Sequence, residues 1–174
     1  FMISTIILAK DEEINLRKSI LSILFSDEII VIDNGSEDAT TLVAKKYHAR
    51  VIDMRHTNDF SELRNRGLQE AKSDWVLFID ADEIVSNELS SEILQELINP
   101  KFSQYYLKRR DHWWGRILKY GEIHSAYTKG FIRLIKKGNG TWKGSVHEVV
   151  CSTDSYGRFE NFIEGKYRAK QGEL

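Results

Sequence analysis

The sequence contains a single cysteine, Cys151, and a single proline, Pro100, among its 174 residues. One cysteine cannot form an intrachain disulfide, and no Cys/His cluster suited to zinc accompanies it, so we expect a reducing, cytoplasmic compartment. The net charge of -1 provides no basic field that would hold nucleic acid or a membrane by charge alone. The apolar run from Met2 to Ala9 is far shorter than the roughly 20 residues that cross a bilayer. We therefore expect a globular domain, and we expect any nucleotide that it recognises to be a small ligand.

Strands and helices alternate through the first eighty residues. The β-branched and apolar runs Ile3–Leu8, Glu28–Asp33, Arg50–Asp53 and Trp75–Ile79 predict strands. Between them, apolar residues recur at helical spacing in three segments: Leu16, Ile20, Ile23 and Leu24; then Ala39, Leu42, Val43 and Tyr47; then Leu63, Gly67, Leu68 and Ala71. Near-continuous apolar strands that alternate with helices predict an α/β, Rossmann-like domain with a mostly parallel central sheet flanked by helices on both faces.

The second half follows a different pattern. After a helix predicted near Ser90–Ile98, short aromatic and basic segments predict strands at Tyr105–Arg110, Gly130–Lys136 and Ser145–Val150, with a turn at Gly138-Asn139-Gly140. No linker, repeat or low-complexity tract separates the halves. We therefore expect a smaller, mixed β extension of the same domain.

Three of the predicted strands end in polar segments. These are Lys10-Asp11-Glu12, Asp33-Asn34-Gly35-Ser36 and Asp80-Ala81-Asp82-Glu83. Ligands of open α/β sheets bind beyond the carboxyl ends of the strands, so we expect these segments to converge on one rim and form a ligand site.

Asp80 and Asp82 are two carboxylates spaced i, i+2 directly after a buried strand. Such a pair can face one divalent cation, since Mg²⁺ and Mn²⁺ prefer oxygen ligands and often share them with substrate phosphates. The alternative is a solvated acidic turn. A phosphatase that phosphorylates its own aspartate is disfavoured, because its motif ends the first strand and is followed by threonine, whereas Glu83 follows here.

Asp33-Asn34-Gly35-Ser36 is placed where a base or ribose could be held, because a fixed carboxylate or amide can pair with a pyrimidine edge. An ordinary turn with a helix cap is equally compatible with it. Arg64 precedes the strand that ends at Asp80, and its guanidinium could clamp a diphosphate. For the nearby Arg66, a solvated helix face is at least as good an interpretation.

In order and spacing, these motifs resemble family 2 of the glycosyltransferases. The matching segments are Ala9-Lys10-Asp11-Glu12-Glu13, Val31 to Thr40, Asp59-Phe60-Ser61, Arg64-Asn65 and Trp75 to Glu83, followed by Gly115-Arg116, Arg133-Leu134 and Trp142 to Glu148. Within the family, the chain is more similar to the bacterial lipopolysaccharide-core β-1,4-glucosyltransferase type. The resemblance covers about residues 2–150 and implies a GT-A fold.

The resemblance implies inverting transfer from a nucleoside diphosphate sugar, usually a uridine diphosphate sugar, with Mg²⁺ or Mn²⁺. It divides a single domain, residues 1–174, into a nucleotide-sugar-binding half (2–100), an acceptor-side half (101–150) and a C-terminal tail (151–174). It also implies a saccharide or lipid-linked acceptor, a role in cell-envelope polysaccharide synthesis and peripheral contact with the inner face of a membrane. The expected donor-binding residues are Ala9, Lys10, Glu12, Asp33, Asn34, Arg64, Asp80 and Ala81, and the expected metal ligands are Asp80, Asp82 and His147.

Two segments depart from the family pattern. Many members carry two consecutive acids where this chain has Asp33-Asn34, and the second acid often contacts uracil, so the identity of the base stays open. Glu122-Ile123-His124-Ser125 lacks the aromatic and proline residues expected before Arg133-Leu134. The acceptor therefore stays open as well.

An inverting transfer needs one general base to take the proton of the acceptor hydroxyl. Glu148 is our candidate, with Asp111 as the next choice, although Glu148 could also be a surface strand residue. His147 could ligate the metal, bind a phosphate or lie in the core.

The tryptophans Trp113, Trp114 and Trp142 could form an acceptor-side wall against a sugar ring, or could belong to the core. Adjacent residues of a strand face opposite sides, so at most one of Trp113 and Trp114 should face the site.

Two other functions compete with a sugar transferase. A catalytically silent nucleotide-sugar or glycan-binding module would keep the same fold, but the presence of Asp80, Asp82 and Glu148 favours an enzyme. A nucleotidyltransferase that makes activated sugars calls for a glycine-rich basic loop after the first strand, and Lys10-Asp11-Glu12-Glu13 contains no glycine.

Overall fold

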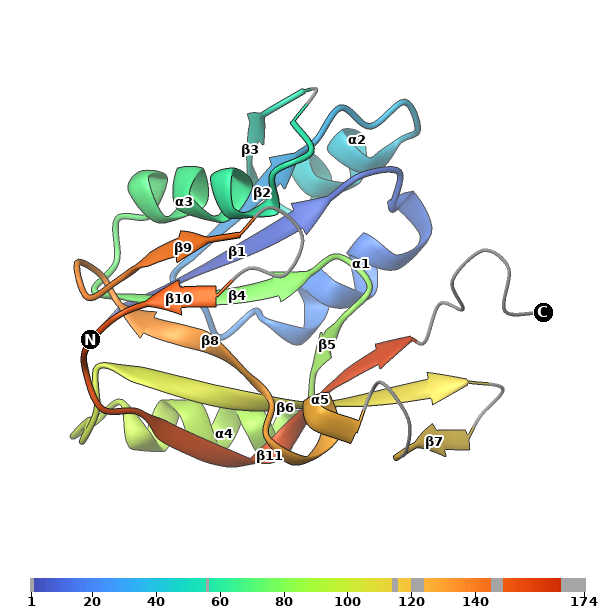
Figure 1. Cartoon of the computed structure of the whole chain (residues 1–174). Coiled ribbons are helices and arrows are strands. Elements are labelled where there is room, and N and C mark those ends of the chain that lie inside the picture. The colour runs from blue at the N-terminus through green and yellow to red at the C-terminus, as the bar shows by residue number, and fades with distance from the viewer. Residues whose placement is uncertain (1, 56, 114–115, 120–123, 145–148, 167–174) are drawn as a thin grey trace.

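The computed structural model describes residues 2–55, 57–113, 116–119, 124–144 and 149–166 (Figure 1). Its first half alternates strands and helices as the apolar periodicity predicts. The elements are β1 (Ile3–Ala9), α1 (Glu13–Ser22), β2 (Glu28–Asp33), α2 (Thr40–Lys46), β3 (Arg50–Asp53), α3 (Phe60–Glu70), β4 (Trp75–Asp80), β5 (Ile84–Val85) and α4 (Asn87–Glu96).

The first four strands form a parallel array in the order β3-β2-β1-β4. All seven residues of β1 are buried, because it lies between β2 and β4 and is covered on both faces. This arrangement explains why the strand reads as a continuous apolar run. The expected Rossmann-like α/β fold is confirmed.

The second half continues the same sheet. It consists of β6 (Gln104–Trp113), β7 (Arg116–Leu118), α5 (His124–Thr128), β8 (Phe131–Lys136), β9 (Thr141–Lys143), β10 (Val149–Cys151) and β11 (Gly157–Lys166). From β4 the order runs β8-β6-β11-β5, with β7 paired to β6, while β9 and β10 form a separate two-stranded sheet. Strand β8 is antiparallel to both β4 and β6, so this half is mixed, as predicted.

The interpretation of residues 151–174 as a tail is wrong for Gly157–Lys166. Strand β11 runs parallel to β6, and its side chains Phe159 and Ile163 are buried in the core. The sequence pattern hides this strand, because the pairing with β6 shifts register between Arg158 and Phe162 and interrupts the alternation of apolar residues. The strand predicted at Ser145–Val150 begins, within the described residues, at Val149.

The two faces of the sheet are covered differently (Figure 1). Apolar residues of α1, α2 and α4 pack on one face in a cluster that includes Ile7 and Ile79. On the other face, Leu63 and Leu68 of α3 and Trp142 of β9 pack against Ile6 and Phe78. The β9–β10 sheet thus covers part of the face on which α3 lies.

Two apolar residues expected on the inner faces of helices are exposed. Leu24 is 61% exposed because α1 ends at Ser22, and Leu42 is 68% exposed while Thr40 and Ala44 face the core. Within the described part of the chain, none of the helices combines the length and the apolar character needed to span a membrane.

Candidate active site

The polar ends of β1, β2 and β4 lie next to one another. Ala9 is paired with Asp33 across the β1–β2 ladder, and Leu8 is paired with Asp80 across the β1–β4 ladder. The amide of Ala81 donates to the carbonyl of Leu8 at 3.1 Å, which holds the loop after β4 against the end of β1. The convergence of these segments on one rim, expected from the sequence, is confirmed.

The loops after β1 and β2 are tied together by hydrogen bonds. Asp11 has a φ of 54° and accepts from the amide of Glu37 at 2.8 Å, while its own amide donates to Ser36 Oγ at 2.9 Å. The amide of Glu12 donates to Thr40 Oγ1 at 2.7 Å. Asp11 and Glu12 therefore fix the shape of this part of the rim.

Asp33 and Asn34 fix the second loop from within. The carboxylate of Asp33 accepts from the amide of Ser36 at 3.1 Å and from its hydroxyl at 2.5 Å. Asn34 donates from Nδ2 to the carbonyl of Thr57 at 3.0 Å. Asn34 Oδ1 is buried and accepts no hydrogen bond from the residues that the structure describes. The turn interpretation is thus correct for Asp33, and Asn34 retains one acceptor.

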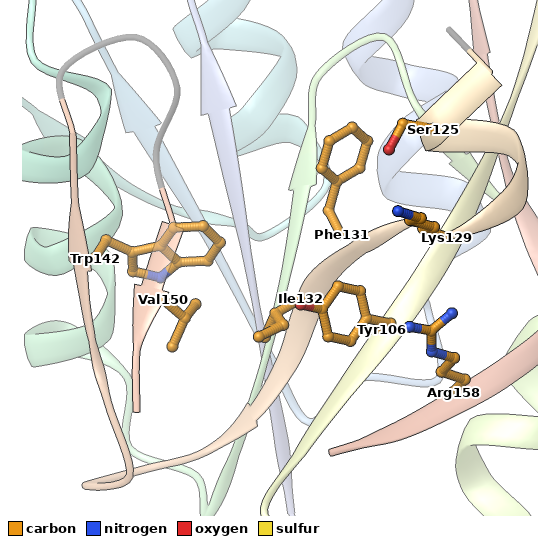
Figure 2. A pocket seen from close by; sticks show the side chains of 9 residues that line it. Tyr106, Ser125, Lys129, Phe131, Ile132, Trp142, Val150 and Arg158 are labelled. Atoms are coloured by element: carbon orange, nitrogen blue, oxygen red, sulfur yellow. The ribbon is translucent and has the colours of Figure 1, made fainter. Parts of the chain in front are cut away.

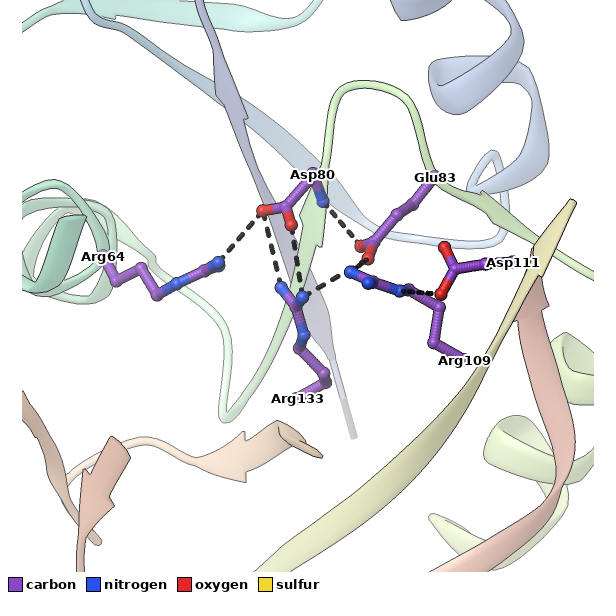
Figure 3. Close-up of polar contacts among 6 residues, drawn as sticks. All are labelled: Arg64, Asp80, Glu83, Arg109, Asp111 and Arg133. Carbon is purple, nitrogen blue, oxygen red and sulfur yellow. Dashed lines mark hydrogen bonds and ion pairs between the residues drawn. The ribbon is translucent and has the colours of Figure 1, made fainter. Parts of the chain in front are cut away.

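Asp80 lies between two arginines that come from different elements (Figure 3). Arg64 of α3 donates from Nη2 to Asp80 Oδ1 at 3.0 Å, and Arg133 of β8 donates from Nη2 to Asp80 Oδ2 at 3.2 Å. Both arginine side chains are almost fully buried, whereas that of Asp80 is partly exposed at the rim. Arg66, by contrast, is exposed and pairs with Glu70 at 2.7 Å, which agrees with the solvated helix face considered for it.

Glu83 extends this network deeper into the protein (Figure 3). Its side chain is 1% exposed and accepts from the backbone amide of Asp80 at 2.8 Å, from Arg133 at 3.3 Å and from Arg109 at 3.4 Å. Arg109 also donates to the buried Asp111 at 3.1 Å. Three arginines and three acids thus balance in charge, as burial of ionised groups requires.

The pKa values of Asp80 and Glu83 are shifted in opposite directions. Burial alone would raise the pKa of Asp80, but the guanidiniums of Arg133 and Arg64 outweigh it, and the pKa lies well below the usual range. Burial raises the pKa of Glu83, and the charge of Asp80 raises it further against the opposing effect of Arg133 and Arg109. Asp80 is therefore ionised across the physiological range.

Asp80 and Asp82 are the two expected metal ligands that lie among the described residues. Among the residues that the structure describes, no three His, Cys, Asp or Glu side chains cluster as a metal site. Both oxygens of Asp80 accept from arginines, whereas Asp82 is half-buried two residues further along the rim. A carboxylate oxygen completed by phosphate oxygens suits Mg²⁺ or Mn²⁺. His147 and Glu148 lie outside the described residues.

The three tryptophans expected on the acceptor side fall in different places. Trp142 is 5% exposed, packs edge-on against Phe78 at 5.1 Å between ring centroids, and lies 5.0 Å from the guanidinium of Arg64. Trp113 is 43% exposed at the end of β6, and Trp114 lies outside the described residues. Trp142 is therefore a core residue that also contacts the Asp80 cluster.

Three members of the cluster were not assigned a role from the sequence. Arg133 and Glu83 both stand in motifs of the family resemblance, but only the fold shows that β8 brings Arg133 to Asp80. Arg109 stands in a basic stretch that resembles a solvated strand face. No local signal distinguishes it from its neighbours.

Comparison with known proteins agrees with this geometry. Residues 4–164 match the family model described as Glycosyl transferase family 2. The chain belongs to this family. The lipopolysaccharide core biosynthesis glycosyltransferase LpsC of Rhizobium meliloti is 26% identical to it over an alignment of 164 residues, and the match covers 89% of this chain and 59% of LpsC. The chain spans only 23% and 31% of the length of two other curated relatives.

Solved structures of the GT-A type share the fold. S. aureus TarS in complex with UDP-GlcNAc has a TM-score of 0.72 at 14% identity, covering 98% of this chain and 60% of TarS. Glucosyl-3-phosphoglycerate synthase from Mycobacterium tuberculosis, solved with Mn²⁺, UDP and glucosyl-3-phosphoglycerate, is 27% identical with a TM-score of 0.53. That match covers 64% of this chain and 44% of the synthase.

Proposed function

We propose that the protein is an inverting, metal-dependent glycosyltransferase that moves a sugar from a nucleoside diphosphate sugar, UDP-glucose or a close analogue, to a saccharide acceptor. The observation that carries this proposal is the convergence of the β1, β2 and β4 loops on one rim, where Asp80 contacts Arg64 and Arg133 and Asp82 follows two residues later. Carboxylates for a cation beside arginines for phosphate form a set that suits a nucleoside diphosphate.

The nucleoside would lie over the β1 and β2 loops, where Ala9, Lys10, Glu12, Asp33 and Asn34 are gathered. Asn34 Oδ1 offers a buried acceptor for a pyrimidine N–H, which supports a uridine donor even though the chain lacks a second acid here. Asp33 and Glu12 would act by holding the loops in shape. The amide of Ala81 donates to the carbonyl of Leu8, and Ala81 would thereby place its backbone close to the sugar nucleotide.

The diphosphate would lie beside Asp80, Ala81 and Asp82. When bound there, Mg²⁺ or Mn²⁺ supplies positive charge to the departing diphosphate. Asp82 would hold the cation, while Asp80 orients Arg64 and Arg133 through its own hydrogen bonds. Support for this cofactor comes from the 27% identical synthase, which binds Mn²⁺ together with UDP.

Glu148 remains our proposed general base and His147 a third metal ligand. Asp111 is a weaker candidate for the base, because its side chain is buried and accepts from Arg109. The similarity to LpsC, a lipopolysaccharide core biosynthesis glycosyltransferase, supports an acceptor in cell-envelope polysaccharide synthesis. We also propose that the protein works at the cytoplasmic side of a membrane, in peripheral contact with it.

Incubation with a panel of nucleoside diphosphate sugars and Mn²⁺, followed by measurement of released nucleoside diphosphate, tests this function. We expect release from a UDP-sugar, faster with a saccharide acceptor and abolished by EDTA. Asp74→Ala, at the opposite end of β4, is a control that should behave like wild type. Binding of UDP-sugars without any turnover would instead identify a catalytically silent binding module.

A further inference from the structure

A pocket of about 340 Å³ lies on the α3 face of the sheet, between the β9–β10 sheet and α5 (Figure 2). Ile132 of β8 and Tyr106 of β6 belong to neighbouring strands, and Trp142 and Val150 come from β9 and β10. The remaining lining residues are Ser125, Lys129, Gly130, Phe131 and Arg158. The volume lies at the lower end of the range for small-molecule sites, about 300–1,000 Å³.

The described residues of the lining combine aromatic rings with positive charge and include no acid. Figure 2 shows Lys129 and Arg158 on the side away from Trp142 and Val150. Arg158 lies over the ring of Tyr106, 5.2 Å from its centroid, which orders the guanidinium at the pocket. Among the described residues, neither Lys129 nor Arg158 forms an ion pair with a carboxylate. The described part of the pocket therefore presents two cations and no acidic side chain beside an apolar wall.

Two of the pocket's rings also contact the Asp80 cluster. Trp142 lies 5.0 Å from the guanidinium of Arg64, and Phe131 lies 5.7 Å from that of Arg133. Both arginines bond to Asp80. A ligand in the pocket is thus separated from the proposed diphosphate site by one layer of side chains, which is the relation expected of the second substrate of a transfer reaction.

Trp142 also has a polar group that the fold leaves unused. Its indole Nε1 is buried and donates to no acceptor among the residues that the structure describes. A buried donor without a partner costs free energy, and a ligand oxygen would satisfy it. Aromatic rings, an indole N–H and two cations together suit a sugar ring that carries a negative charge.

We propose that this pocket binds the acceptor, and that the acceptor is an anionic saccharide whose phosphate or carboxylate is held by Lys129 and Arg158. The identification of this ligand as the acceptor rests on the proposed function. The preference of the pocket for anionic sugars depends only on its own residues.

Calorimetric titration with glucose 6-phosphate, glucuronate and uncharged glucose, each in the presence of saturating UDP and Mn²⁺, tests the proposal. We expect at least one anionic sugar to bind more tightly than glucose. Comparison of the affinities for glucose 6-phosphate and glucuronate then shows whether the pocket prefers a phosphate or a carboxylate. Lys129→Gln with Arg158→Gln should weaken that binding by about tenfold or more, because two charged donors are lost. The matched double variant Lys45→Gln with Lys46→Gln, on α2 and away from the pocket, should leave it unchanged.

A second readout, by NMR, follows the indole of Trp142. In ¹H–¹⁵N spectra, the indole signal that Trp142→Phe removes should shift when the anionic sugar is added to wild type. Arg158→Lys keeps the charge and should retain most of the affinity if the double variant loses it through electrostatics alone.

Equal affinity for glucose and both anionic sugars, or equal affinity in wild type and the double variant, would overturn the proposal. Displacement of the anionic sugar by UDP would overturn it too, since the cations would then serve the donor. Failure of the proposed function looks different, because nucleotide-sugar turnover would be absent while charge-dependent sugar binding persisted.

Discussion

Arg64 of α3 contacts Asp80 and Trp142 at the same time. Its Nη2 lies 3.0 Å from Asp80 Oδ1, and its guanidinium carbon lies 5.0 Å from the centroid of the Trp142 ring. One buried cation therefore joins the end of β4, where we place the diphosphate, to the wall of the pocket in which we place the acceptor. Arg64 thus contacts residues of both the proposed diphosphate site and the proposed acceptor pocket.

Replacement of Asp80 by asparagine should destabilise the fold. Asp80→Asn leaves the buried guanidiniums of Arg64 and Arg133 without their charged partner, so the free energy of unfolding should fall by about 1–3 kcal/mol. Asp53→Asn, which breaks the exposed ion pair with Arg55, should change it by less than about 1 kcal/mol. Urea denaturation at pH 7 measures both, and equal effects would contradict the role assigned to Asp80.

The same variant predicts a pH dependence. The folded pKa of Asp80 is lowered, so the stabilisation from its charge is present above the unfolded pKa of about 3.9 and is lost as pH falls toward the folded value. The stability difference between wild type and Asp80→Asn should therefore be largest near neutral pH and shrink below about pH 4. A difference that grows on acidification would mean that Asp80 is not held ionised by its arginines.

Gly130 precedes β8 in a conformation that excludes side chains. Its φ is 75°, and a Cβ there would lie 2.2 Å from the carbonyl oxygen of Leu107. Gly138 has a φ of 90°, but a Cβ would meet nothing within 4 Å. Gly138→Ala should cost about 1–2 kcal/mol from the backbone conformation alone, and Gly130→Ala clearly more. Thermal unfolding measures the stability of both variants, and a similar loss in both would show that a steric clash at Gly130 does not add to the cost.

Glu148→Gln tests the assignment of the base. It retains size and hydrogen bonding but cannot accept a proton, so turnover should fall by roughly 10²-fold or more while UDP affinity changes little. Glu160→Gln, in the exposed ion pair with Lys108, is the matched control and should retain activity. If Glu148→Gln stays within a few-fold of wild type, another group takes the proton.

Much of the donor side could be predicted from the sequence because local patterns determine it. Parallel strands joined by helices bring their carboxyl ends to one edge, so Asp33 and Asp80 are placed together by alternation alone. The sequence predicts less accurately which residues of a helix face the core. Leu42 fits the helical period, yet it is exposed, because α2 is only seven residues long and buries Thr40 and Ala44 instead.

The second half could not be predicted to the same depth, because its contacts join distant segments. Arg133 reaches Asp80 across 53 residues of chain, and only the antiparallel pairing of β8 with β4 brings them together. Strand β11 pairs with β6, about fifty residues earlier, through a shift in register that breaks its period. The pocket combines residues from six elements, so no single motif indicates it.

Titration of UDP into the protein with and without Mn²⁺ tests the central claim most directly. We place a nucleoside diphosphate at the rim of β1, β2 and β4, with the cation held by Asp82. We predict that UDP binds wild type only when Mn²⁺ is present, that Asp82→Ala abolishes this binding, and that Asp74→Ala at the far end of β4 preserves it. Equal UDP affinity in wild type and Asp82→Ala, with and without Mn²⁺, would contradict the account.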